Sequence, residues 1–182
     1  MNEKDIWALL ETVPDPEVPV LSVVDLGVVR AVSIETTSSL DPTRVETDSD
    51  ALGLTTDETN LTITITPTYS GCPAMDMISM GIRIALLEAG YKKVHIVQQL
   101  SPAWTTDWMS EAGKRKLKEY GIAPPLSNII VDELFGEDHK IQCPQCDSMN
   151  TELVSQFGST SCKALYRCLD CKEPFDYFKC HR

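Results

Sequence analysis

Two pairs of cysteines near the C-terminal end of the sequence constrain its fold more than any other feature. Each pair has the spacing C-x-x-C, with 21 residues between the pairs, and the members are Cys143, Cys146, Cys168 and Cys171. Two cysteines three positions apart on a tight turn can direct both sulfur atoms at one ion, and two such turns supply the tetrahedral thiolate set that Zn²⁺ prefers. We therefore predict a zinc-ribbon domain over residues 139–182 with one structural zinc ion per chain.

The size of this segment supports a structural metal. Roughly 45 residues are too few for a self-sufficient hydrophobic core, so a metal crosslink would explain how the segment folds. Free thiols or disulfides would leave it without a stabiliser in a reducing compartment. A rubredoxin-like iron site uses the same ligands, and the spacing does not distinguish it from zinc. Four cysteine ligands leave no open coordination position, so we expect a structural and not a catalytic ion.

Three further groups in this segment are candidate ligands. Cys162 lies in FGSTSCK, just before a strand-like segment, and is either an additional sulfur near the ribbon metal or a packed small residue. Cys180 and His181 stand next to the end of the sequence, where chains are usually poorly ordered. For all three groups the sequence leaves both interpretations open.

The composition excludes several classes of function. The 182 residues, 42% of them hydrophobic, suffice for one core and a small appendage, and the apolar stretches fall short of the roughly 20 residues that a membrane span needs. A net charge of −11 argues against a nucleic-acid partner. The N-terminus lacks the basic start and apolar run of a signal peptide, so we expect a cytoplasmic protein with mostly reduced cysteines.

Much of the negative charge lies in one segment. Residues 35–60 contain seven acidic residues and one basic residue, so they contribute −6 to the net charge. The segment is rich in serine and threonine and has no sustained apolar period. We predict that it is an acidic loop insertion in contact with solvent.

The remaining pattern predicts an α+β domain over residues 1–122. The expected helices and strands, in chain order, are a helix at 5–10, strands at 28–34 and 61–66, a helix at 74–89, a strand at 94–100 and a helix at 110–120. The first two strands form a hairpin whose loop is the acidic insertion. We expect a small mixed sheet packed by helices, a linker at 123–138, and then the ribbon.

Cys72 stands apart from the other six cysteines, which all lie beyond residue 142. It precedes Pro73, which suits the first position of the predicted helix 74–89. Unpaired N–H groups and the positive end of the helix dipole meet there and favour a thiolate. Gly71 lets the backbone approach a ligand closely. The thiol is therefore either reactive or packed at a helix start. Several carboxylates could gather near it, although the sequence does not bring distant segments together: Asp15, Glu17, Asp25 and Asp76.

At this point the motifs resemble a known family. DPEVPVLSVVDLGVVR and TITPTYSGCPAMDMI are similar to the metal-sulfur cluster biosynthesis domain of SufT-like proteins. The further stretches SPAWTTDWMSEAGKRKLKEYGIAPP, CPQC, FGSTSCKALYRC and CKEPFDYFKCH resemble the phenylacetate-degradation protein D family (PaaD, also PaaJ). The resemblance covers nearly the whole chain, and its main departure is the long acidic loop at 35–60.

The resemblance implies an accessory protein of phenylacetyl-CoA epoxidase, a multicomponent di-iron monooxygenase fed by a reductase that carries flavin and a 2Fe–2S centre. It also implies Fe–S cluster maturation or delivery, with that reductase as the main partner, and no catalytic activity of the chain itself. Carried over to matching positions, Asp15, Asp25 and Cys72 are the candidates for handling iron or a cluster. A transient cluster, shared across a homodimer, would pass to an acceptor by ligand exchange.

Three alternative functions remain open. A structural or regulatory subunit would bind the oxygenase and handle no metal beyond its own zinc. An enzyme with Cys72 as nucleophile would need a histidine base. The sequence gives no sign that any of its three histidines lies near Cys72: His95 is in a predicted strand, His139 next to the predicted linker and His181 near the end of the sequence. A zinc-ribbon protein that binds nucleic acid is disfavoured by the acidic composition.

Overall fold

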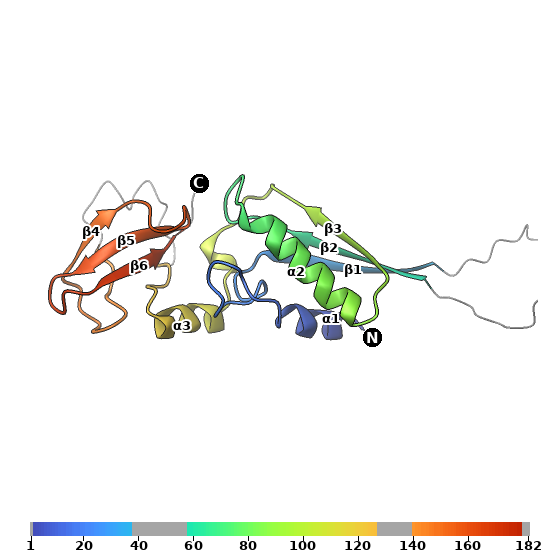
Figure 1. Cartoon of the computed structure of the whole chain (residues 1–182), viewed down its shortest axis with the longest axis horizontal. Helices are drawn as coiled ribbons and strands as arrows, with labels where there is room; N and C mark the ends of the chain where they lie inside the picture. Colours follow the sequence, from blue (N-terminus) through green and yellow to red (C-terminus); the bar gives the residue numbers. More distant parts are fainter. Residues whose placement is uncertain (1, 38–57, 127–139, 180–182) are drawn as a thin grey trace, which may run out of the picture.

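A three-stranded mixed sheet forms the centre of the N-terminal domain (Figure 1). The structure is a computed structural model, and it describes residues 2–37, 58–126 and 140–179. β1 (Val29–Thr37) pairs antiparallel with β2 (Glu58–Ile65), and β2 pairs parallel with β3 (Lys93–Gln98). A parallel pair needs a crossover connection, which α2 (Ala74–Glu88) provides. The predicted α+β fold with a small mixed sheet is confirmed.

α2 packs on the sheet through one apolar face. Four residues spaced along this face are each no more than 5% exposed: Met75, Ile78, Ile82 and Leu86. They join one core with Leu61, Ile63 and Ile65, the alternate residues of β2 that share a face of the sheet. Burial of this face holds α2 against the sheet. The N-terminal end of α2 lies on the side of the ribbon domain (Figure 1).

α1 (Glu3–Leu10) begins earlier than the predicted helix at 5–10. The reason is a capping box in which the Asn2 side chain accepts from the Asp5 N–H (3.1 Å) and the Asp5 carboxylate accepts from the Asn2 N–H (2.8 Å). Ile6 and Leu10 are completely buried and attach the helix to the core.

β1 and β2 extend beyond the predicted hairpin strands. Thr37 pairs with Glu58, so the ladder runs into both ends of the stretch predicted as an acidic loop. These ends contain Thr36 and Thr37 in β1 and Thr59 in β2, and β-branched residues favour extended backbone. The rest of the predicted loop, residues 38–57, lies outside the described residues.

A short 3₁₀ turn, η1 (Thr106–Trp108), leads to α3 (Glu111–Tyr120). Ser110 caps α3 by accepting from the Gly113 N–H (2.8 Å). The helix ends at Gly121, whose φ of 92° is the left-handed conformation that glycine adopts readily. Both ends agree with the prediction for residues 110–120.

The C-terminal domain contains an antiparallel sheet of three strands: β4 (Thr151–Ser155), β5 (Lys163–Cys168) and β6 (Pro174–Phe178). Its small core is aromatic. Tyr166 stacks on Phe175 with ring centroids 5.8 Å apart and meets Tyr177 edge-on at 5.9 Å. This sheet and the four cysteines beside it fit the predicted ribbon.

The two domains share a continuous contact. Ala123 pairs with β6, because its N–H donates to the Asp176 carbonyl (2.8 Å) and its carbonyl accepts from the Phe178 N–H (2.9 Å). Phe178 belongs to the core of the N-terminal domain and meets Trp104 edge-on at 6.3 Å. The chain therefore engages the ribbon sheet at the first residue of the predicted linker 123–138. Residues 127–139 of that linker lie outside the described residues.

Candidate functional site

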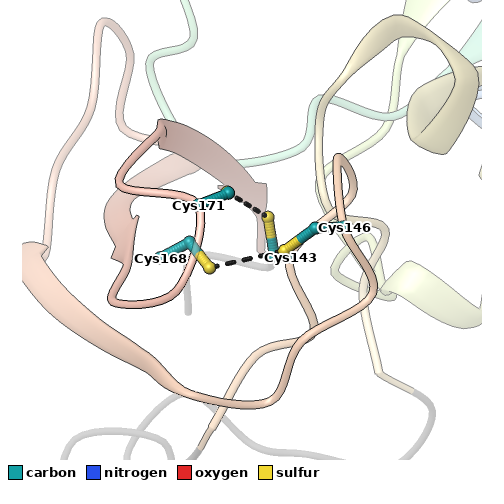
Figure 2. A group of neighbouring side chains, drawn as sticks. All are labelled: Cys143, Cys146, Cys168 and Cys171. Atoms are coloured by element: carbon teal, nitrogen blue, oxygen red, sulfur yellow. Dashed lines mark hydrogen bonds between the residues drawn. The ribbon is translucent and has the colours of Figure 1, made fainter.

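The four cysteines of the C-x-x-C pairs meet at one point between two turns (Figure 2). The Sγ atoms of Cys143 and Cys171 are 3.8 Å apart, those of Cys146 and Cys168 are 3.6 Å apart, and all four lie within 4.8 Å of one another. Four sulfurs at about 2.3 Å from a tetrahedral Zn²⁺ would be about 3.8 Å apart. The cluster therefore fits a structural metal ion, and the thiolate set suits zinc.

The two turns are built alike, which explains why they converge. The residue after each pair has a positive φ, 58° at Asp147 and 69° at Lys172. In each turn the N–H of the first cysteine donates to the carbonyl five residues later, Cys143 to Ser148 (2.9 Å) and Cys168 to Glu173 (3.0 Å). Each turn thus places both of its sulfurs on the same side.

Asp170 ties the two turns together. Its carboxylate accepts from Ser148 Oγ (2.5 Å) and Asn150 Nδ2 (2.7 Å), two groups that follow the first turn. These hydrogen bonds hold the pKa of Asp170 below its usual value. The Asp170 carboxylate therefore holds the two cysteine turns in a fixed position relative to each other.

A group of polar side chains lines a small cavity between the two domains. Its polar members come from three segments far apart in the sequence: Asp15, Glu17, Thr68, Cys72 and Cys162. Apolar walls from both domains complete it, among them Met75 of α2 and Phe178 of β6. The cavity has a volume of about 10 Å³, which is room for one water-sized group.

The Asp15 to Val18 turn is held by Asp15 itself. Its Oδ1 accepts from the N–H groups of Glu17 (3.0 Å) and Val18 (2.8 Å). Burial raises the pKa of Asp15, the two backbone hydrogen bonds lower it, and the neighbouring Glu17 carboxylate adds to the increase. The pKa of Asp15 stays above its usual value, so the folded protein holds the ionised form of Asp15 less favourably than water does.

Cys72 stands next to the N-cap residue of α2, which is Pro73. Pro73 makes no side-chain capping hydrogen bond and lies one position before the first helical residue, so its prediction at the first helical position is wrong by one residue. The Cys72 carbonyl accepts from the Met75 N–H (3.3 Å), and the side chain is half-buried. Tyr69 lies beside it: burial raises the pKa of Tyr69, Cys72 raises it further, and Ser161 of the ribbon lowers it. The Cys72 loop thus touches the ribbon loop.

Cys162 reaches the cavity from the ribbon domain. Its Sγ is 3.0 Å from Thr160 Oγ1 and 3.7 Å from Glu17 Oε2, to which the thiol donates. Burial raises the pKa of Cys162 to about 11, against the hydrogen bond with Thr160, which lowers it. The structure therefore places this predicted candidate with Cys72 and Glu17, and it is not among the four cysteines of the described metal cluster.

Asp25 lies elsewhere and has structural partners. It accepts from Ser110 Oγ (2.7 Å) and Lys116 Nζ (2.5 Å), which join it to α3. Burial by itself would raise the pKa of Asp25, but the hydrogen bonds from Lys116 and Ser110 outweigh it and hold the pKa below its usual value. Asp25 does not line the Cys72 cavity.

Of the four carboxylates that the sequence offered as neighbours of Cys72, the structure places Asp15 and Glu17 around the same cavity, and it adds Thr68. Nothing in the sequence showed which of these carboxylates would meet the thiol. Thr68 also lines a wider cleft of about 480 Å³, together with Tyr69, Leu100 and Trp104. The other two candidate ligands, Cys180 and His181, lie outside the described residues.

Known proteins resemble both parts of the chain. The model of the PaaD zinc beta ribbon domain matches residues 130–179, and that of an iron-sulfur cluster assembly protein matches residues 3–45. A putative component of the 1,2-phenylacetyl-CoA epoxidase of Escherichia coli K12 is 46% identical over 97% of this chain and 92% of its own length. An Fe-S protein maturation auxiliary factor of Porphyromonas gingivalis W83 is 33% identical over 64% and 90%.

A solved domain of unknown function from Bacillus anthracis is 26% identical over 63% of this chain and 90% of its own length, with a TM-score of 0.47. Within the part of the chain that the structure describes, no helix has the length and apolar character needed to cross a membrane.

Proposed function

Because the chain belongs to the PaaD family, we propose that it is an accessory protein of a phenylacetyl-CoA epoxidase that helps an Fe–S component of that complex acquire its cluster. The family relation supports the link to the epoxidase, since the Escherichia coli relative is named as one of its components. The N-terminal match to a cluster assembly domain supports maturation as the task. In this role the chain is not itself the catalyst.

The observation that carries the proposal is that the half-buried Cys72 lines one cavity with the carboxylates Asp15 and Glu17. Thiolates and carboxylates together suit iron. The site is separate from the four-cysteine cluster, whose closed ligand set leaves no position for exchange. Weak binding suits a carrier, because delivery requires that the acceptor win the metal.

The client in this proposal is the reductase of the epoxidase system, which the family resemblance describes as carrying flavin and a 2Fe–2S centre. The cleft that adjoins the cavity through Thr68 offers space for a segment of that partner. A homodimer that shares one cluster between two Cys72 thiols is compatible with the same site. Asp25 acts in our proposal as a structural bridge to α3 and not as a ligand.

The test is to co-express the epoxidase components with the wild-type protein or with Cys72→Ser and to measure iron and sulfide in the purified reductase. We expect Cys72→Ser to reduce both contents by several fold. Ser33→Ala is the control, because Ser33 is exposed on β1 and lines neither the cavity nor the cleft. Equal cluster content with wild-type and Cys72→Ser protein would contradict the proposal.

A second candidate function is a structural or regulatory role in the oxygenase complex without any handling of a cluster. The observation that favours it is an exposed apolar stripe on α2, opposite the core face: Met77, Met80, Ile84 and Leu87 are between 48% and 63% exposed. Such stripes commonly mark protein interfaces. This alternative predicts normal reductase clusters with Cys72→Ser. It also predicts loss of complex formation with Met80→Lys, measured by size-exclusion chromatography of the mixed components.

A further inference from the structure

We propose that the outer edge of β3 is the docking site for an extended, acidic segment of the client protein, which pairs with β3 as a fourth strand. The occupant that we assign is a segment of the Fe–S reductase, so the inference rests on the proposed function for the identity of the client. It adds to that function the surface where the client binds and the chemistry of the segment that the client presents.

One edge of β3 has no neighbouring strand among the described residues. β3 stands last in the strand order β1-β2-β3 (Figure 1), and of the described helices and strands it contacts only β2 and α2. A strand at the edge of a sheet presents a row of N–H and C=O groups with which another chain can pair. Extended peptides bind to such edges through main-chain hydrogen bonds.

The ladder between β2 and β3 shows which main-chain groups point outward. The Gln99 N–H donates to the Ile65 carbonyl (2.8 Å), so the main chain of Gln99 faces β2. Because these groups alternate in direction along a strand, the N–H and C=O of Ile96 and Gln98 face away from β2. Among the described residues, no hydrogen bond from a helix or loop reaches these outward groups. Ile96 and Gln98 are therefore the two pairing positions.

The beginning of this edge is closed by a side chain of α2. Arg83 Nη1 donates to the Val94 carbonyl (3.2 Å), which faces the same way as the outward groups of Ile96 and Gln98. A partner strand can therefore pair from Ile96 onward, and it meets a guanidinium group where the pairing starts.

The charge of this region favours an acidic partner. Residues 89–106 contain Lys92 and Lys93 and no acidic residue, although the chain as a whole has a net charge of −11. Both lysines are exposed and precede Val94 directly, where Arg83 adds a third positive charge. Opposite charges across an interface steer association and fix its register. A second copy of β3 would bring lysines and no acidic group to this edge, so its charge does not match.

The other end of the edge leads to the cleft beside the Cys72 loop. Leu100 follows β3 by two residues, is 59% exposed and lines the cleft together with Tyr69 and Trp104. The cleft volume of about 480 Å³ admits a large apolar side chain of the partner. We therefore expect acidic residues at one end of the client segment and an apolar anchor at the other, which lies beside the loop that carries Cys72.

The experiment measures binding of the purified reductase to the full-length protein by calorimetry. Gln98→Pro removes the outward N–H and keeps the ladder to β2, because an edge strand tolerates proline where the missing N–H faces solvent. Reductase binding should weaken by at least about tenfold, since one main-chain hydrogen bond and the space for the partner strand are lost. Gln98→Ala keeps the N–H, so it is the matched control and should bind like the wild type.

The charge of the partner is tested with Lys92→Glu. This variant should bind the reductase more weakly than the wild type at low salt, and the difference should shrink at high salt, because salt screens exposed charges. Equal affinity of the two proteins at low salt would contradict an acidic segment.

Wild-type affinity in Gln98→Pro would overturn the inference, and so would the absence of reductase binding by the wild type. A wild-type dimer that Gln98→Pro dissociates would identify a second copy as the occupant and would also overturn it. If Gln98→Pro does not fold, as judged by urea unfolding, amide hydrogen exchange of the wild type decides. The Ile96 and Gln98 N–H groups should exchange more slowly once the reductase is bound, and unchanged exchange would contradict the docking site.

The outcome for the proposed function is separable. Weaker reductase binding by Gln98→Pro, combined with normal reductase clusters after co-expression with Cys72→Ser, would support the docking site and reject the maturation role. Normal binding by Gln98→Pro, combined with reductase clusters that depend on Cys72, would do the reverse.

Discussion

The two cysteine sites of this protein differ in how they are assembled. The ribbon cluster is local, since each of its two turns is set by a stretch of about six residues, and its four sulfurs lie close enough together to hold one metal ion. The cavity between the domains collects Asp15, Cys72 and Cys162 from segments up to 147 residues apart in sequence. A closed local site suits stability, and an open site assembled by tertiary contacts suits exchange.

Removal of the ribbon metal should have the largest effect, because it tests whether the local site supports the distant one. Cys143→Ser should lose the one equivalent of metal and the ordered ribbon, since binding of a structural zinc ion contributes about 10–16 kcal/mol to folding. We also expect loss of the Cys72 cavity, because Cys162 would no longer be held. Metal content and amide hydrogen exchange measure both effects.

Cys72→Ser is the matched comparison and should keep its ribbon zinc. Loss of zinc in both variants would mean that the two regions are not independent and that the division into domains is wrong.

The contact between the domains should be the next most sensitive feature. Phe178→Ala should lower the free energy of unfolding by about 3–5 kcal/mol, because a large side chain that is 2% exposed would leave a void beside Trp104. Urea unfolding measures the loss. The same variant should make Cys162 more reactive toward an alkylating reagent while the ribbon metal stays bound.

Phe157→Ala is the control in the same domain. Phe157 is 52% exposed and contacts Lys179 at 4.5 Å, so its removal should cost about 1 kcal/mol or less. Equal destabilisation by both substitutions would argue against a specific contribution of Phe178 to the contact between the domains.

The contrast between local and tertiary assembly also explains what the sequence could predict. The spacing of the ribbon cysteines and the Gly-Cys-Pro start of α2 are local signals, and they led to the right fold and to Cys72 at a helix start. Cys162 was ambiguous because nothing near residue 162 indicates a partner 90 residues earlier in the chain. Ala123 was assigned to a linker because a single residue pairing with β6 has no sequence pattern.

Asp25→Asn should have a moderate effect on stability and leave metal binding unchanged. We expect a loss of about 1–2 kcal/mol at neutral pH, since the carboxylate is hydrogen-bonded by Ser110 and a Lys116 that is partly screened by solvent. The pKa of Asp25 is lower in the folded state. Its contribution is therefore present above the unfolded pKa of about 4 and lost as the pH falls through the folded value.

Acid unfolding curves of the wild type and Asp25→Asn should thus converge at low pH. Glu111→Gln on the surface of α3 is the control and should change little. Loss of Fe²⁺ binding in Asp25→Asn would return Asp25 to the candidate ligands and would weaken the distinction between a structural and an exchanging carboxylate.

Asp15→Asn should have the smallest effect on stability, and its sign is informative. The pKa of Asp15 is raised by burial, so the folded state binds the proton more tightly and stability falls as the pH rises from the unfolded to the folded pKa. Asparagine keeps the oxygen that accepts from Glu17 and Val18 without the buried charge. We expect the variant to be as stable as the wild type at pH 7, or more stable by up to about 1 kcal/mol.

The Fe²⁺ affinity of Asp15→Asn should fall, because one negative charge near the ion is gone. Urea unfolding and calorimetry on the same preparation measure both quantities. Lower stability with unchanged affinity would make Asp15 a turn-forming residue only and would remove it from the candidates for handling iron.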